Sequence, residues 1–324
     1  MATAQPSPDF DPGFTQRYQG SLLRAINKDG SFNIRRRGVP FEVILGSAYQ
    51  GLVGMRWPKF LSLVLLGYLA VNTLFAGLYW LLGPEAVHAS DPAITLGSFA
   101  RAFFFSVQTL TTVGYGHLYP TGMGANVLAA VEAALGLMGF ALATGLLFAR
   151  FSRPNARLAF SNSMIVAPYR GGTGLQFRIA NQRSNVLMEV DAMMMLMTVE
   201  QGPNGEMRRN FAELRLERRN IFFLALTWTI VHPIDESSPL WGLSAQDLER
   251  EQAEIMILIK GFDDSFRQVV HRRYSYRWDE IEWDAQFEPA FDVSEEGHMV
   301  LDIGRVSGTV KPGPAVPPLH AADR

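Results

Sequence analysis

The sequence predicts a membrane protein in which two transmembrane α-helices enclose a short re-entrant helix and are followed by an all-β, immunoglobulin-like sandwich domain. Two long apolar runs, at 60–82 and 125–150, carry the first part of this prediction. A third apolar run between them, at 98–110, is too short to span a membrane. After residue 152, short apolar runs alternate with turn residues, which is typical of a β-sandwich.

Composition excludes several classes of function. The 324 residues carry a formal net charge of −2, which does not favour nucleic acid as a partner, and the absence of cysteine excludes disulfides and thiolate metal sites. No nucleotide-binding, zinc-protease or nucleophile-elbow motif is found. We therefore predict that the protein is not an enzyme and has no cofactor. The polar residues 1–39 lack a signal-peptide core, so we expect a cytoplasmic N-terminal segment.

The two long apolar runs have the length and composition of membrane spans. The first carries no charge and, at about 1.5 Å per residue, reaches about 34 Å, enough to cross a hydrocarbon core. The second contains one carboxylate, Glu132, which is costly against lipid and should face protein or water. Glycines on the second run, Gly136 and Gly145 among them, allow either close helix packing or a bend.

Basic residues lie just outside the spans, on the side of the two termini. They are Arg35, Arg36, Arg37, Arg56 and Lys59 before the first span, and Arg150, Arg153 and Arg157 after the second. In the body of the loop between the spans, Arg101 is the only Lys or Arg residue. The positive-inside rule therefore predicts a multi-pass protein of the inner cell membrane with both termini in the cytoplasm.

The short apolar run leads directly into TTVGYG at 111–116. Non-helical backbone at membrane depth is tolerated only where it is buried in protein or lines a cavity. Rings of backbone carbonyls from four TVGYG loops replace the hydration shell of a K⁺ ion. We therefore predict a K⁺ selectivity filter and, because one loop cannot surround an ion, a homotetramer. The filter residues are Thr112, Val113, Gly114, Tyr115 and Gly116, with K⁺ held at the first four.

The filter prediction has consequences for local structure. Gly114 and Gly116 permit backbone angles that are costly for residues with a Cβ. We expect the side chains of Val113 and Tyr115 to pack against the helix at 98–110. The negative C-terminal end of that helix would face a central cavity and favour cations there.

Four motifs resemble a known family: TTVGYG at 111–116, ARFSRP at 149–154, FRIANQRSNVLMEV at 177–190 and TWTIVHPIDESSPLWGLS at 227–244. On these motifs, the stretch from about residue 34 to 289 resembles the bacterial relatives of inward-rectifier potassium channels. The resemblance implies an amphipathic slide helix at 40–57 on the inner membrane surface and a pore domain at 58–151. The apolar residues of 41–55 recur at helical spacing, and Pro40 suits a helix start.

The resemblance also implies roles at the inner end of the second span. Phe148 resembles the hydrophobic gate of the helix bundle, the alternative being a lipid-facing side chain. Gly136 and Gly145 would serve as hinges. The basic cluster resembles the residues that meet phosphoinositide or other anionic lipid head groups in this family, although membrane topology alone explains the same charges. Its members are Arg56, Lys59, Arg150, Arg153 and Arg157.

The sequence departs from the family pattern in two respects. Strong rectifiers hold an acidic residue in the second span. The aligned position in this chain lies near Phe140, so strong block by polyamines is not expected. Many relatives pair a pore-helix Glu with an Arg after the filter, but Gln108 and Leu118 stand there, so no stranded charge results. Glu132 either replaces some of the lost negative charge near the filter or hydrogen-bonds within the protein.

The soluble domain is predicted at 152–308, followed by a Pro-rich disordered tail at 309–324. The methionine-rich run 193–197 is interpreted as a strand buried on both faces, the alternative being a flexible binding surface. His232 and Asp235 resemble a catalytic pair, but without a nucleophile or metal partner we interpret them as a hydrogen-bonded turn.

Two hypotheses for function follow. The first is a tetrameric, passive K⁺ channel of the inward-rectifier type with a gate at the inner end of the second span. The alternative is a membrane-anchored sensor that uses its β-sandwich to bind a soluble partner. The alternative explains the spans and the soluble domain, but it does not explain the filter sequence between the spans.

Overall fold

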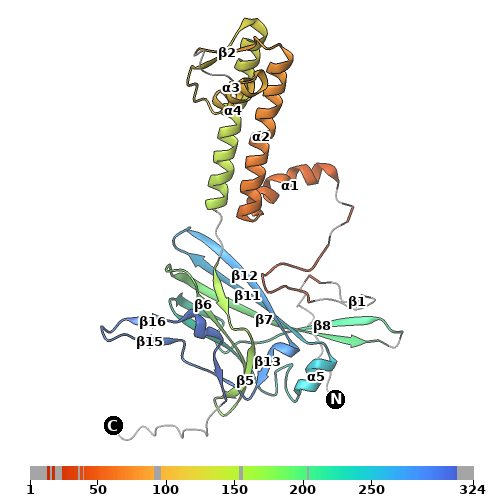
Figure 1. The fold of residues 1–324 in the computed structure, drawn as a ribbon. Helices are drawn as coiled ribbons and strands as arrows, with labels where there is room; N and C mark the ends of the chain where they lie inside the picture. The colour runs from red at the N-terminus through yellow and green to blue at the C-terminus, as the bar shows by residue number, and fades with distance from the viewer. Residues whose placement is uncertain are drawn as a thin grey trace. The chain divides into compact units, whose positions relative to one another are not determined.

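The computed structural model describes residues 13–14, 17–18, 24–35, 37–38, 40–90, 96–152, 156–202 and 204–311, with the backbone path alone for 41–47. The chain divides into two compact units (Figure 1). One, here called the helical unit, contains residues 36–153. The other, here called the β unit, contains residues 1–35 and 154–324. Arg36 and Arg153 of the predicted basic clusters lie outside the described residues.

The helical unit consists of four helices and one small ribbon. They are α1 (Phe41–Gly54), α2 (Trp57–Leu81), β2 (Val87–Ala89), α3 (Ser98–Leu110), β3 (Leu118–Pro120) and α4 (Gly122–Phe151). The long helices α2 and α4 extend beyond the predicted spans at their starts, because Pro58 in the first turn and the turn at Gly122 suit helix beginnings. Both are long and apolar enough to cross a membrane, and 17% and 11% of their apolar windows are buried within one chain.

The short helix α3 packs against both long helices (Figure 1). The core between them is apolar and includes Phe75, Tyr79, Ala102, Phe105 and Ala125. The rings of Tyr79 and Phe105 meet edge to face, with centroids 5.2 Å apart. Strands β2 and β3 pair antiparallel and join the loops on either side of α3. This core holds the segment after α3 in one position relative to α4.

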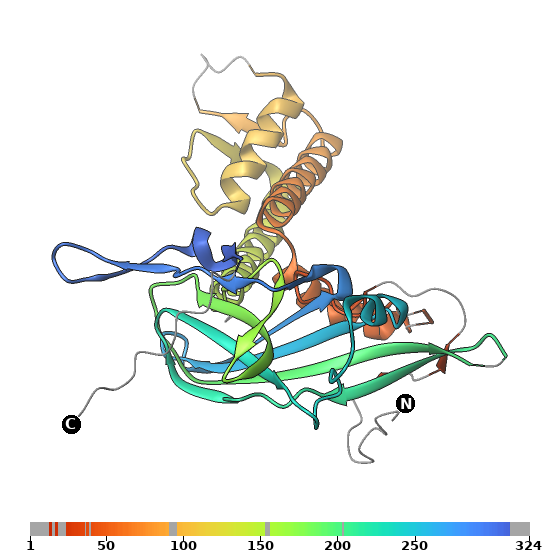
Figure 2. The same ribbon diagram turned by 90° about the horizontal axis from the view of Figure 1, so that it is seen from below.

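The β unit contains two stacked sheets, so the predicted fold class is confirmed (Figure 2). The first has the order β1-β8-β7-β11-β12 with β9 on β7, and the second β10-β6-β5-β13 with β4 on β6. Their apolar faces share one core, to which Phe177 and Ile230 contribute from one sheet and Leu196 and Ile257 from the other. Small pairs β14–β17 and β15–β16 complete the unit.

The strands and short helices of the β unit have the following bounds. They are β1 (Arg17–Tyr18), β4 (Leu158–Phe160), β5 (Met164–Tyr169), β6 (Gly172–Asn181), β7 (Leu187–Gln201), β8 (Met207–Glu213), β9 (Asn220–Leu224), β10 (Thr227–Ile234), α5 (Ala245–Arg250), β11 (Glu254–Asp263), β12 (Gln268–Arg277), β13 (Ile281–Trp283), β14 (Gln286–Phe287), β15 (Phe291–Val293), β16 (Met299–Leu301) and β17 (Thr309–Val310), with 3-10 turns at Trp278–Glu280 and Ile303–Ser307. Strand β17 lies within the predicted tail, and 312–324 is outside the described residues.

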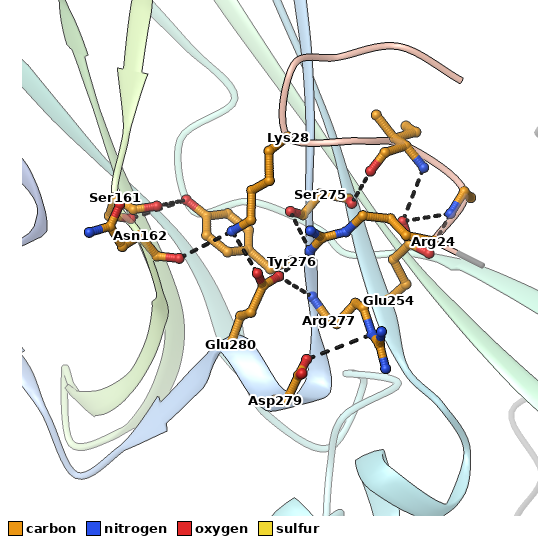
Figure 3. Close-up of polar contacts among 12 residues, drawn as sticks. Arg24, Lys28, Ser161, Asn162, Glu254, Ser275, Tyr276, Arg277, Asp279 and Glu280 are labelled. Carbon is orange, nitrogen blue, oxygen red and sulfur yellow. Dashed lines mark hydrogen bonds and ion pairs between the residues drawn. The ribbon is translucent and has the colours of Figure 1, made fainter. Parts of the chain in front are cut away.

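The N-terminal segment makes contacts that the sequence did not predict. Residues 24–33 lie along the β unit (Figure 3). The buried Glu254 carboxylate accepts the backbone N–H groups of Ala25 and Ile26, and Ser275 Oγ donates to the carbonyl of Ile26 at 2.7 Å. The sequence did not reveal this docking because the two partners are more than 220 residues apart.

This docking also explains the methionine-rich run in β7. Met194 belongs to the core between the sheets, as does Leu196. On the other face, Met195 and Met197 pack with Ala25 and Ile26. Met193 remains 38% exposed, so burial on both faces holds only where the N-terminal segment covers the strand.

Candidate ion-conduction site

The predicted filter segment directly follows α3. The backbone N–H groups of Val113 and Gly114 donate to the carbonyl of Gln108, at 3.0 and 3.2 Å. The backbone is left-handed at every second residue, with φ of 60° at Thr112, 57° at Gly114 and 82° at Gly116. Such alternation turns successive carbonyl groups to the same side of the chain. Glycine adopts these angles without the penalty that a Cβ imposes, which is the physical reason for its presence at two of the three positions.

The side chains of the filter segment are not covered by this chain's own α3. Val113 is 53% exposed and Tyr115 is 75% exposed. One chain thus leaves these two side chains largely exposed, and their packing on the short helix stays a prediction. The Tyr115 ring instead lies 5.8 Å from the ring of His117.

Gln108 contacts the predicted filter segment through its backbone carbonyl, while its side chain is buried. Neither amide atom of that side chain has a hydrogen-bond partner among the described residues. Leu118, at the other predicted position of the missing ion pair, is also buried and lies in β3. The two positions are thus both uncharged and both buried, so neither leaves an unpaired charge beside the predicted filter segment.

Glu132 lies in a fully buried polar cluster between the three helices. The Tyr79 hydroxyl donates to Oε2 of Glu132 at 2.8 Å, and Ser106 Oγ lies within hydrogen-bond distance of Oε1. Ser106 Oγ also lies 3.1 Å from Oδ1 of Asn72. Two roles were predicted for Glu132: replacing lost negative charge, or hydrogen bonding within the protein. The structure shows the hydrogen bonds. Sequence patterns did not identify Asn72, Tyr79 and Ser106 as members of this cluster, because only the fold brings them close to Glu132.

The two predicted hinge glycines have different surroundings. A Cβ at Gly136 would lie 2.2 Å from the carbonyl oxygen of Leu110, the last residue of α3. Gly136 therefore permits the close approach of α4 to the end of α3. At Gly145 an added Cβ would meet nothing within 4 Å. Helix α4 is continuous from Gly122 to Phe151, so hinge bending at either glycine stays a prediction.

Phe148, the predicted gate, lies near the C-terminal end of α4. Its side chain is 72% exposed in one chain. It is therefore free to meet lipid, a pore or other copies of the chain. The gate stays a prediction, because one chain does not contain the opposing side chains that would close it.

The predicted lipid-binding residues fall into two groups. Arg56, Lys59 and Arg157 are exposed. Arg56 and Lys59 line an open hollow with residues at the end of α1: Gln50, Gly51, Gly54 and Met55. These cations are available to an anionic head group, and their lipid role stays a prediction.

Arg150 behaves differently, because its guanidinium is engaged within the helical unit. It donates to the backbone carbonyls of Leu52, Val53 and Met55, the last at 2.6 Å. It also stacks over the rings of Trp57 and Phe60, with centroid distances of 4.6 and 4.3 Å. Arg150 thus caps the C-terminus of α1, where a cation complements the helix dipole.

The suspected catalytic pair has a structural role: His232 is buried in β10, and Asp235 is exposed in the turn that follows the strand. His232 Nδ1 contacts the carbonyl of Arg215 at 2.6 Å, and Nε2 lies 2.7 Å from Ser238 Oγ. Asp235 accepts from Ser237 instead of orienting the imidazole. Burial lowers the pKa of His232, outweighing the contact with the Arg215 carbonyl and the nearby Asp235 charge. Within the described part of the chain, no group of three His, Asp or Glu residues could hold a metal ion.

Comparison with known proteins now decides the family. The model of the inward rectifier potassium channel C-terminal domain matches residues 158–322, and the ion channel model matches 64–153. Kirbac3.1, an inward rectifier potassium channel of Paramagnetospirillum magnetotacticum, is 38% identical over 87% of this chain and 94% of its own length. The chain belongs to the inward-rectifier potassium channel family.

Animal members of the family are more distant. G protein-activated inward rectifier potassium channel 3 of Mus musculus is 30% identical over 92% of this chain and 81% of its own length. ATP-sensitive inward rectifier potassium channel 12 of Bos taurus is 28% identical over the whole chain and 80% of its own length. The resemblance predicted from the motifs is therefore confirmed, and with it the assignment of the protein to membrane potassium channels.

Proposed function

We propose that four copies of the chain form a K⁺-selective channel whose filter is Thr112–Gly116. The observation that carries this proposal is the left-handed backbone at residues 112, 114 and 116. Carbonyls turned to one side of a chain give a ring of oxygen ligands when four copies face a common axis, and such rings replace the hydration shell of K⁺. Conduction is passive, and no chemical step or cofactor is involved.

Exposure of apolar surface supports the tetramer. In one chain the side chains of Val113 and Tyr115 in the proposed filter are 53% and 75% exposed. Neighbouring copies in a closed ring would cover them with their own helices, as a cyclic assembly requires. The proposal therefore moves the expected contact of these side chains from the chain's own α3 to that of an adjacent copy.

The proposal also includes a gate at Phe148 and an orientation of the chain in the membrane. Four Phe148 side chains would meet near the inner ends of the α4 helices and close the path by steric contact or dewetting. The basic residues flanking α2 and α4 favour a cytoplasmic β unit and an inner-membrane location. Lipid regulation would act through the exposed Arg56, Lys59 and Arg157, with Arg153 as a further candidate, each attracting anionic lipid by about 1 kcal/mol.

The decisive experiment is K⁺ flux into liposomes that contain the purified full-length protein, with Na⁺ and Ba²⁺ controls. We expect Ba²⁺-blocked flux that favours K⁺ over Na⁺ and is lost in Gly114→Ala, since alanine disfavours a φ of 57°. Gly139→Ala is the matched control, because an added Cβ there meets nothing within 4 Å. Flux that persists unchanged in Gly114→Ala would contradict the proposed filter.

If the wild-type protein shows no K⁺ flux in liposomes, one further variant is needed. Phe148→Ala should leak K⁺ if the bundle is closed at that residue. Chemical cross-linking into tetramers without leak in Phe148→Ala would instead favour the membrane-anchored sensor. Flux should rise with anionic lipid in the wild type and rise less in a triple alanine variant of Arg56, Lys59 and Arg157.

A further inference from the structure

The buried cluster around Glu132 unites all three helices that hold the filter. Its four polar side chains come from α2 (Asn72 and Tyr79), α3 (Ser106) and α4 (Glu132), and each is 0% exposed. Because one chain already encloses them completely, neither lipid nor a second copy of the chain can supply a further partner. The groups must satisfy one another.

Counting hydrogens determines which arrangement does so. Asn72 Nδ2 donates to the carbonyl of Tyr68 at 2.7 Å, which leaves Asn72 Oδ1 as an acceptor facing Ser106 Oγ. The Ser106 hydroxyl has one hydrogen but lies within reach of two acceptors, Asn72 Oδ1 and Glu132 Oε1. If Glu132 were ionised, one of those two contacts would join two acceptors with no hydrogen between them.

Exchanging the amide atoms of Asn72 does not remove this conflict. The Asn72 oxygen would then face the carbonyl oxygen of Tyr68 at the same 2.7 Å. Every contact is satisfied if Glu132 carries a proton. Tyr79 then donates to Glu132 Oε2, Glu132 Oε1–H donates to Ser106, and Ser106 donates to Asn72. The chain of donors ends at the carbonyl of Tyr68.

The charges around the cluster agree with this assignment. In the described residues, no Lys, Arg or His lies at ion-pair distance from Glu132. An ionised carboxylate buried without a cation is strongly disfavoured, and such groups are neutralised instead.

We propose that Glu132 is a neutral, protonated acid that positions the pore helix α3 for ion selection. It supplies no negative charge to the filter. It fixes Ser106, and the carbonyl of Gln108, two residues further along α3, accepts the N–H groups of Val113 and Gly114. Glu132 is therefore a positioning residue that acts on the filter through α3. The positioning part rests on the proposed function, whereas the protonation state does not.

The protonation state is tested by infrared difference spectroscopy on the full-length protein at neutral pH. The wild type minus Glu132→Gln should show the carbonyl band of a protonated carboxylic acid. Glu85→Gln is the matched control, since the Glu85 side chain is 77% exposed and its difference should show ionised carboxylate bands only. Ionised bands alone from the Glu132 pair would overturn the assignment, whether or not the protein conducts.

The positioning role is tested by selectivity of K⁺ over Na⁺. Glutamine has the shape of the protonated acid, donating to Ser106 and accepting from Tyr79, so Glu132→Gln should keep wild-type selectivity. Glu132→Ala and Ser106→Ala should lower it, because loss of the buried hydrogen bonds lets α3 shift, and with it the carbonyl of Gln108 that accepts from Val113 and Gly114. Unchanged selectivity in Glu132→Ala, in a protein that conducts as wild type, would overturn the positioning role. Loss in Glu132→Gln equal to that in alanine would show that charge, not position, is what matters.

Discussion

The backbone N–H of Ala25 donates to the carboxylate of Glu254, 2.9 Å from Oε2, across 229 residues of sequence. Glu254 is 3% exposed and also receives the N–H of Ile26. Close by, Lys28 Nζ lies 2.7 Å from Glu280 and over the rings of Tyr274 and Tyr276, while Arg24 pairs with the same carboxylate (Figure 3). Two carboxylates of the β unit thus hold one short stretch of the N-terminal segment.

The first prediction concerns this docking. Glu254→Ala removes the acceptor of two buried N–H groups, at a cost of about 1–3 kcal/mol for each group left unsatisfied. We expect the peptide 24–33 to lose protection in hydrogen-exchange mass spectrometry, while β6 and β10 keep theirs. Glu249→Ala, which changes an exposed Glu on α5, is the control. Unchanged protection of 24–33 in Glu254→Ala would contradict the role of this carboxylate.

The second prediction concerns pH and His232. Burial lowers the pKa of His232 below its ordinary value of 6.5, so the unfolded chain takes up this proton more readily than the folded one. The contribution to stability is complete above about pH 6.5 and is lost as the pH falls towards the folded pKa, by up to about 1.4 kcal/mol per pH unit. Pulse proteolysis in urea at pH 7.5 and pH 5.5 measures the loss for the β unit.

The control for this pH dependence is an exposed histidine. His298→Gln changes a side chain that is 79% exposed, and it should leave the slope of stability against pH as in the wild type. His232→Gln should flatten the slope. An equal slope in all three proteins would mean that other groups cause the acid sensitivity.

The third prediction concerns the contact between α4 and the end of α3. Gly136→Ala puts a methyl group against the carbonyl of Leu110, and overpacking of this kind costs about 1–3 kcal/mol. We expect a lower melting temperature and reduced K⁺ flux, because the proposed filter directly follows the shifted α3. Gly139→Ala should show neither effect. Wild-type flux and stability in Gly136→Ala would show that the close contact is dispensable.

The fourth prediction separates capping from lipid binding at Arg150. A lysine keeps the charge but lacks the planar guanidinium fork that contacts the carbonyls of Leu52, Val53 and Met55, so Arg150→Lys should expose the C-terminal amides of α1 to hydrogen exchange. Arg150→Gln should do the same and lose a cap contribution of about 1 kcal/mol. If instead Arg150→Lys behaves as the wild type, while Arg150→Gln alters the response of K⁺ flux to anionic lipid, Arg150 acts as a lipid-binding charge.

Several features of this protein follow from local sequence signals. The run 98–110 is apolar and ends at Thr111, and it forms α3. The glycines of TTVGYG predict left-handed backbone, which the structure has at Gly114 and Gly116. These signals are sufficient because the length of an apolar run and the freedom of glycine act over a few residues, wherever the rest of the chain lies.

Other features depend on residues that no local pattern connects. Arg150 has the sequence signature of a juxtamembrane cation, yet it caps a helix that ends almost a hundred residues earlier. Glu132 has the signature of a membrane acid, but the partners that determine its state, Tyr79 and Ser106, lie on other helices.

The sequence by itself therefore determined the two long apolar helices and the sandwich, because hydrophobic length and strand alternation are local properties. Its motifs indicated the family, and the filter stays a prediction from one of them. Only the tertiary structure decided which cations remain free, whether Glu132 has hydrogen-bond partners, and that residues 24–33 belong to the β unit. Hydrogen bonds and ion pairs require contact within a few ångströms, and such contact between distant residues exists only after the chain has folded.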